Sequence, residues 1–165
     1  MNLNNMKTEI ISSDLAVKLN QALQKEMYAS HLYRHLAVKC QFMGYFGSQS
    51  FFLHESSDEL EHFNKLVDFL NDVGYEAIIP STPEMTEEVN SLMDMLKLAY
   101  DTEQKLLTFY SDIFKMNEPV VQEVILDFIK IQRTSVGEYG DLISRLEIIK
   151  DDPCGLIIFD QEMKK

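Results

Sequence analysis

The sequence has few of the residues that make turns, cross-links or membrane spans. Six glycines and four prolines in 165 residues are too few for a sandwich or barrel, which needs many turns. Cys40 and Cys154 form neither a CxxC pair nor a zinc-like cluster, so a reducing cytoplasmic location is expected. No apolar run approaches the ~20 residues that cross a bilayer, and the amino terminus lacks a signal-like apolar segment. We expect neither secretion nor membrane insertion.

Positive charge is also scarce. Lys and Arg total 15 against 27 for Asp and Glu, a formal net charge of −12. This balance disfavours nucleic acid and anionic membranes as partners and favours cations, although solubility alone could explain it. The length suits a single domain, residues 1–165, with a full hydrophobic core.

Apolar residues recur at helical spacing in four long segments. Ser12 or Ser13 can cap a first helix that starts near Asp14, and the segment "GYFG" separates it from a second helix ending at Gly74. Thr86, followed by two glutamates, predicts the start of the third helix, and Pro119 predicts the start of the fourth.

These segments predict an all-α four-helix bundle. The bundle spans 14–147 after an extension at 1–13, and a short fifth helix and tail follow at 154–165. Short links make the first pair and the last pair of helices antiparallel. The long link between the second and third helices can cross the bundle's length and make those two parallel.

Each predicted helix carries a polar interruption in its apolar face, near its midpoint. A midpoint stays at mid-height whichever way a helix runs, so these side chains should meet in one layer. Several buried carboxylates together cost several kcal/mol per ion unless protons or a cation neutralise them. The interruptions are Glu26, Glu59 with His62, Glu103, and Gln132 with Ser135.

This set of side chains predicts a metal site. His62 lies one turn after Glu59 on the same face, and Glu59 is placed to bridge two ions. Carboxylate, imidazole and amide ligands suit iron better than structural zinc, which favours thiolates. The alternative is a hydrogen-bonded polar layer that fixes helix register.

Five segments together resemble the ferritin family, specifically bacterial non-haem ferritin subunits with a ferroxidase centre like that of heavy chains. The resemblance covers nearly the whole chain, and it implies a ferritin-like bundle with a long crossover and a short fifth helix. The segments are "LNQALQKEMYASHLY", "FFLHESSDELEHFNKL", "DTEQKLL", "IQRTS" and "GLIIFDQEM".

The resemblance implies a role for each central residue. Glu26, Glu59 and His62 would hold a first iron, and Glu59 and Glu103 a second. Gln132 would orient oxygen species or water beside the second iron. Tyr33 matches a redox-active tyrosine of the family, with a hydrogen-bonded core phenol as the alternative.

Several positions depart from relatives or have uncertain roles. Leu60 stands where a bacterioferritin has its haem-ligating methionine, which predicts no haem. Ser135 puts a third iron site in doubt, because many bacterial relatives have glutamate there. Gln122 and Ile125 replace acidic entry-channel residues, for which Glu118 or Glu123 could substitute.

Other polar residues of the first two predicted helices have less definite roles. Asp58 and Glu61 could assist iron transit or nucleation, or only face solvent. Glu55 could be an acid supporting the metal ligands or a hydrogen-bonded core residue. His31 and His35 project away from Glu26 and are poor ligand candidates.

The resemblance implies iron storage by a ferroxidase. Fe2+ would be oxidised by dioxygen or peroxide at an intrasubunit di-iron site, and ferric oxide would be stored in a hollow shell of 24 identical subunits. No second E-x-x-H occurs, so the second iron should be held weakly and passed on. The alternatives are a resident di-iron oxidase and a shell or nucleation subunit with weak ferroxidase activity.

Overall fold

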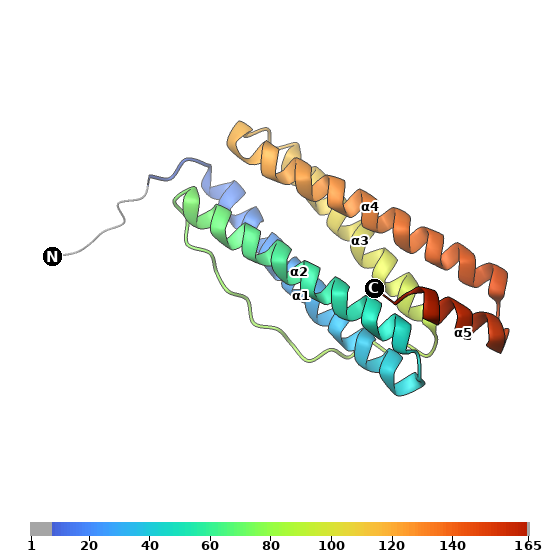
Figure 1. The fold of residues 1–165 in the computed structure, drawn as a ribbon. Coiled ribbons are helices and arrows are strands. Elements are labelled where there is room, and N and C mark those ends of the chain that lie inside the picture. Colours follow the sequence, from blue (N-terminus) through green and yellow to red (C-terminus); the bar gives the residue numbers. More distant parts are fainter. Residues whose placement is uncertain (1–7, 165) are drawn as a thin grey trace.

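The computed structural model describes residues 8–164, and all regular elements in that range are helices (Figure 1). The prediction of an all-α bundle with a short fifth helix is therefore confirmed. No described helix is long and apolar enough to cross a membrane. The helices are α1 (Ser13–Met43), α2 (Phe46–Asp72), α3 (Leu92–Phe114), α4 (Pro119–Ile149) and α5 (Pro153–Glu162).

Local sequence signals explain most of the helix boundaries. Ser12 caps α1, because its side-chain oxygen accepts a hydrogen bond from the Leu15 backbone N–H at 3.3 Å. Gly44 ends α1 with φ of 85°, a left-handed conformation that costs glycine little. Pro119 opens α4, where its missing N–H is not needed, as predicted.

The predicted start of the third helix at Thr86 is wrong, because α3 begins at Leu92. Ser91 is the actual cap and accepts a hydrogen bond from the Asp94 N–H at 3.1 Å. Glu87 accepts hydrogen bonds from the Thr86 N–H at 3.1 Å and from the Tyr28 hydroxyl of α1 at 2.6 Å. The segment before Ser91 therefore packs on α1 as part of the connection instead of forming a first helical turn.

The helices form two antiparallel pairs, α1 with α2 and α3 with α4 (Figure 1). The connection between α2 and α3 runs along the length of the bundle, so these two helices are parallel, as predicted. This crossover is typical of one class of four-helix bundle. It brings the midpoints of all four long helices to the same height.

The fifth helix fixes the start of α2. Asp160 of α5 is buried, and its carboxylate accepts hydrogen bonds from the backbone N–H groups of Gly47 at 3.0 Å and Ser48 at 2.7 Å. A Cβ atom at Gly47 would lie 1.7 Å from the Asp160 carbonyl oxygen, so only glycine fits there. The helix that carries Glu59 and His62 is thus held at its first turn.

Candidate metal centre

Two glutamates from neighbouring helices lie fully buried at the centre of the bundle. Glu26 of α1 and Glu103 of α3 each have 0% exposure. The Tyr110 hydroxyl donates a hydrogen bond to Oε1 of Glu26, and the Tyr33 hydroxyl donates one to Oε1 of Glu103. Each carboxylate is therefore held by a phenol from the other helix.

Helix α2 supplies Glu59 and His62, which lie close to Glu26 of α1. The Nδ1 atom of His62 lies 3.2 Å from Oε2 of Glu59 and 3.6 Å from Oε2 of Glu26. One ligand atom from each of these three buried residues lies within 4.8 Å of the others. The three first-iron ligands implied by the sequence therefore converge in space.

Gln132 lies on α4 with 0% exposure. Within the described chain, its Oε1 and Nε2 atoms have no hydrogen-bond partner, and neither do Oε2 of Glu26 and Oε2 of Glu103. Buried polar atoms are rarely left without partners, because each costs about 1–3 kcal/mol. Three residues at the bundle centre therefore present polar atoms that a bound ion or water would satisfy.

The electrostatics of the centre favour a cation. Burial is the main cause that raises the pKa of Glu59 well above its usual value, and the negative charges of Glu26, Glu103 and Glu55 add to the effect. Burial also raises the pKa of Glu103 to about 8, although the hydrogen bond from Tyr33 opposes the shift. A divalent cation would replace the protons that these carboxylates otherwise retain.

The donor set fits iron. Three carboxylates, one imidazole and one amide give oxygen and nitrogen ligands without a thiolate, since the described cysteines lie elsewhere. Glu59 lies close enough to Glu26 and Glu103 for their charges to affect its pKa. The arrangement can gather divalent cations between α1, α2 and α3, with a weaker, neutral contribution from α4.

A second group with ligand spacing lies one turn earlier on α2. His54, Glu55 and Asp58 each offer one atom within 4.8 Å of the others, and His54 Nδ1 lies 3.0 Å from Asp58 Oδ2. His54 is exposed and Glu55 is buried, where it accepts a hydrogen bond from the Tyr139 hydroxyl at 3.3 Å. Asp58 is half-buried and grouped with His54 and Glu55, while Glu61 is exposed.

Other residues considered in the sequence lie outside the centre. His31 is exposed, and the Nε2 atom of His35 lies 3.0 Å from the Glu87 carbonyl oxygen. Ser135 is half-buried and donates to the Ile131 carbonyl at 3.3 Å.

The entry-channel positions also lie apart from the centre. Ile125 is fully buried in the core of this chain, whereas Glu123 is exposed. Gln122 donates to Asn117 at 2.9 Å. The Glu118 carboxylate accepts a hydrogen bond from the Ser12 backbone N–H at 3.0 Å.

Sequence reasoning missed two tyrosines that contact the centre. Tyr110 bonds to Glu26, and Tyr139 bonds to Glu55 while stacking on Tyr33 with ring centroids 6.2 Å apart. Both are buried residues on the apolar faces of their helices. The spacing of Tyr110 from Glu103 equals that of Tyr33 from Glu26, which is the signal that could have identified it.

Four long helices with a crossover connection and a central carboxylate–imidazole group define the class of bundles that bind metal between their helices. A family model for the ferritin-like domain matches residues 16–149. The chain therefore belongs to the ferritin family, whose members bind and store iron.

Named relatives span nearly the same length. A bacterial non-heme ferritin of Staphylococcus haemolyticus is 27% identical over 93% of this chain and 95% of its own. A probable bacterial non-heme ferritin-like protein of Haemophilus influenzae is 21% identical over 93% of this chain and 96% of its own. An open pore ferritin from Archaeoglobus fulgidus has the same fold, with a TM-score of 0.90, 20% identity and coverage of 93% and 97%.

Proposed function

We propose that this protein is a ferroxidase that stores iron. Fe2+ is its substrate, dioxygen or peroxide is the oxidant, and ferric oxide kept inside an oligomeric shell is the product. The observation that carries the proposal is the convergence of Glu26, Glu59 and His62, with ligand atoms within 4.8 Å, beside the buried Glu103.

The residues have distinct parts in the proposed reaction. Glu26 and His62 bind one Fe2+ ion, Glu103 binds a second, and Glu59 is shared between them. Two Fe2+ ions give one electron each to dioxygen, which takes up two protons and leaves as hydrogen peroxide. The paired carboxylates favour Fe3+ over Fe2+ because negative ligands stabilise the higher charge.

Gln132 and Tyr33 lie beside the proposed reaction without adding charge. The Gln132 amide, which has no hydrogen-bond partner among residues 8–164, can hydrogen-bond to oxygen or water, and Tyr33 orients Glu103 through its hydrogen bond. Since α4 offers no carboxylate here, the ferric product is held weakly and moves on to the mineral. Asp58 and Glu61 are the proposed transit or nucleation residues, and Leu60 is the basis for proposing no haem.

Assembly of identical chains into a shell, as a 24-mer, is part of the proposal. Several large apolar side chains are exposed near the α1–α2 turn and on the last two helices, where subunits in a shell would cover them. They include Phe42 at 91% exposure, Ile148 at 82% and Phe46 at 65%, with Ile157 and Ile158 on α5. The free thiols of Cys40 and Cys154 suit a reducing cytoplasm.

The test adds excess Fe2+ in air to metal-free protein and follows oxidation, particle size and iron retained per chain. We expect a large soluble particle with many irons per chain, and Glu26→Ala or Glu103→Ala should slow oxidation. A small oligomer that saturates near two irons and keeps them through dialysis would indicate a resident di-iron oxidase. A large particle whose rate of Fe2+ oxidation is unchanged by both substitutions would indicate a shell or nucleation subunit.

A further inference from the structure

Two glutamates on neighbouring helices are each followed by a tyrosine at the same spacing. Tyr33 follows Glu26 by seven residues on α1, and Tyr110 follows Glu103 by seven residues on α3. Seven residues are close to two helical turns, about 10 Å along the axis, so each tyrosine shares a face with its glutamate. Because α1 and α3 run in opposite directions, each tyrosine is level with the glutamate of the other helix.

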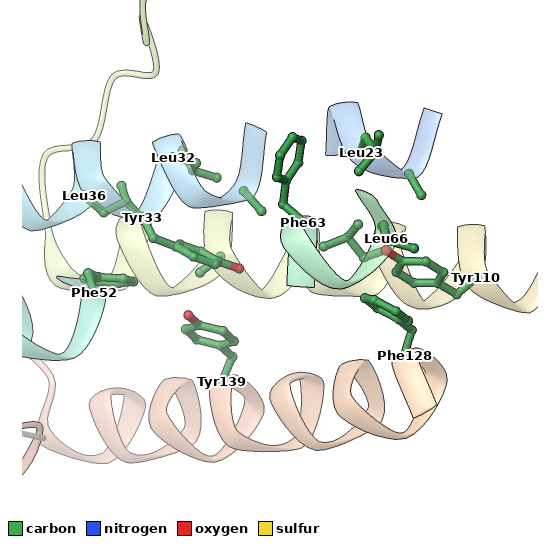
Figure 2. Close-up of a cluster of buried hydrophobic side chains, with 14 of the residues drawn as sticks. Leu23, Leu32, Tyr33, Leu36, Phe52, Phe63, Leu66, Tyr110, Phe128 and Tyr139 are labelled. Atoms are coloured by element: carbon green, nitrogen blue, oxygen red, sulfur yellow. The ribbon is translucent and has the colours of Figure 1, made fainter. Parts of the chain in front are cut away.

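Each tyrosine hydrogen-bonds to the glutamate of the other helix. Tyr33 donates to Oε1 of Glu103, and Tyr110 donates to Oε1 of Glu26. In the described chain, Oε2 of each glutamate has no hydrogen-bond partner. Figure 2 shows the phenol oxygens of Tyr33 and Tyr110 pointing toward each other from opposite ends of this part of the core. Each phenol occupies one oxygen and leaves the other for a ligand.

We infer that Tyr110 is a positioning residue of the metal site, which holds Oε1 of Glu26 so that Oε2 faces an ion bound with Glu59 and His62. The inference rests on the proposed role of Glu26 as a metal ligand. Oε2 already lies on the ligand side, 3.6 Å from Nδ1 of His62. A carboxylate that is held in this way loses less conformational freedom when the ion binds.

Packing fixes the Tyr110 ring independently of its hydroxyl. The ring has 0% exposure and stacks on Phe128, with centroids 4.8 Å apart and planes at 27° (Figure 2). Phe128 also meets the edge of His62, with centroids 5.8 Å apart. A Tyr110→Phe variant therefore keeps the aromatic packing and removes only the hydrogen bond to Glu26.

The test titrates Co2+ into the metal-free assembled protein, because Co2+ is less readily oxidised by air than Fe2+. Tyr110→Phe should weaken the Glu26-dependent Co2+ site by about 10–100-fold and alter its visible absorption. Tyr28→Phe is the matched control, since its hydroxyl bonds to Glu87 in the crossover connection, away from the centre. Circular dichroism and particle size check that each variant folds and assembles.

A double-mutant cycle separates positioning from general structure. Glu26→Gln should weaken Co2+ binding, and Tyr110→Phe should add no further loss in that background. If Glu26→Gln weakens binding but Tyr110→Phe leaves affinity and spectrum unchanged, the inference is overturned and the proposed function stands. Additive losses also overturn it, because the phenol then acts without Glu26. If Glu26→Gln itself has no effect, the metal site of the proposed function fails as well.

Discussion

The four long helices form two pairs of different kinds. Helices α1 and α3 contribute the same elements, a buried glutamate and a tyrosine seven residues later that bonds to the opposite glutamate. Helices α2 and α4 contribute different elements, because α2 has Glu59 and His62 where α4 has the neutral Gln132. The tyrosine–glutamate hydrogen bonds are therefore arranged symmetrically, whereas the proposed ligands are not.

An asymmetric ligand set suits an ion that must leave. Charged and imidazole ligands hold a divalent cation more strongly than a single amide does. We therefore expect strong capture on the α2 side and easy loss on the α4 side. In the proposed function, the hydrogen bonds from Tyr33 and Tyr110 would keep Glu103 and Glu26 oriented while the bound ions change.

The largest effect is expected from removing Glu59, the carboxylate that we propose is shared between two ions. Glu59→Ala should lower the initial rate of Fe2+ oxidation by at least about 100-fold, since losing a ligand costs more than losing a residue that only supports one. Oxygen uptake measures the rate. Asp68→Ala, an exposed acid on the same helix, is the control and should keep the wild-type rate. Near-normal activity of Glu59→Ala would contradict the proposed site.

A carboxylate added to α4 would make the proposed ligands of α4 more like those of α2. Gln132→Glu should raise the iron retained after dialysis by about tenfold, or ~1.4 kcal/mol, because a buried carboxylate attracts the ion more than an amide. Iron analysis per chain measures retention. Gln104→Glu on the exposed face of α3 adds the same charge and should change nothing. Equal retention in both variants would show that Gln132 does not face the ion.

The pH dependence tests the α3 carboxylate. Folding raises the pKa of Glu103 from 4.5 to about 8, so the folded state holds its proton more tightly and this stabilisation is largest at low pH. The stabilisation is lost as pH rises through about 8, so metal-free protein should unfold more easily at pH 8 than at pH 6. Urea unfolding with a chelator measures this, and Zn2+ should offset the loss.

The control for the pH experiment is Glu103→Gln. Other ionisable groups also contribute to the pH dependence of stability, so only the part of the slope that this variant removes belongs to Glu103. An unchanged slope would mean that the Glu103 carboxyl is already ionised in the metal-free fold.

The smallest expected effect concerns the stability of the metal-free protein. Gln132→Leu should raise its free energy of unfolding by about 1 kcal/mol, because two buried unpartnered amide atoms are replaced by an apolar group of similar size. The melting temperature should rise by about 2–4 °C. Gln104→Leu, at an exposed position, should give no such gain. A loss of stability in Gln132→Leu would indicate that the amide is satisfied.

Much of the fold was predictable because it depends on local patterns. The stripe from Leu15 to Cys40 identifies the buried face of α1, and Pro119 marks the start of α4. The start of α3 was not predictable, since Thr86 and Glu87 form a plausible helix start. Two contacts between residues far apart in the sequence show why that segment joins the connection. The Tyr28 hydroxyl donates to the Glu87 carboxylate, and Nε2 of His35 lies 3.0 Å from the Glu87 carbonyl oxygen.

Helical periodicity is a local property, so the sequence alone was enough to predict four long helices and their buried faces. It also placed Glu26, Glu59, His62, Glu103 and Gln132 near the middle of those helices. The tertiary structure decided which side chains meet. Antiparallel packing pairs Tyr110 with Glu26 and Tyr33 with Glu103, while both keep one carboxylate oxygen open. Such pairings depend on the direction and rotation of neighbouring helices, which no single helix encodes.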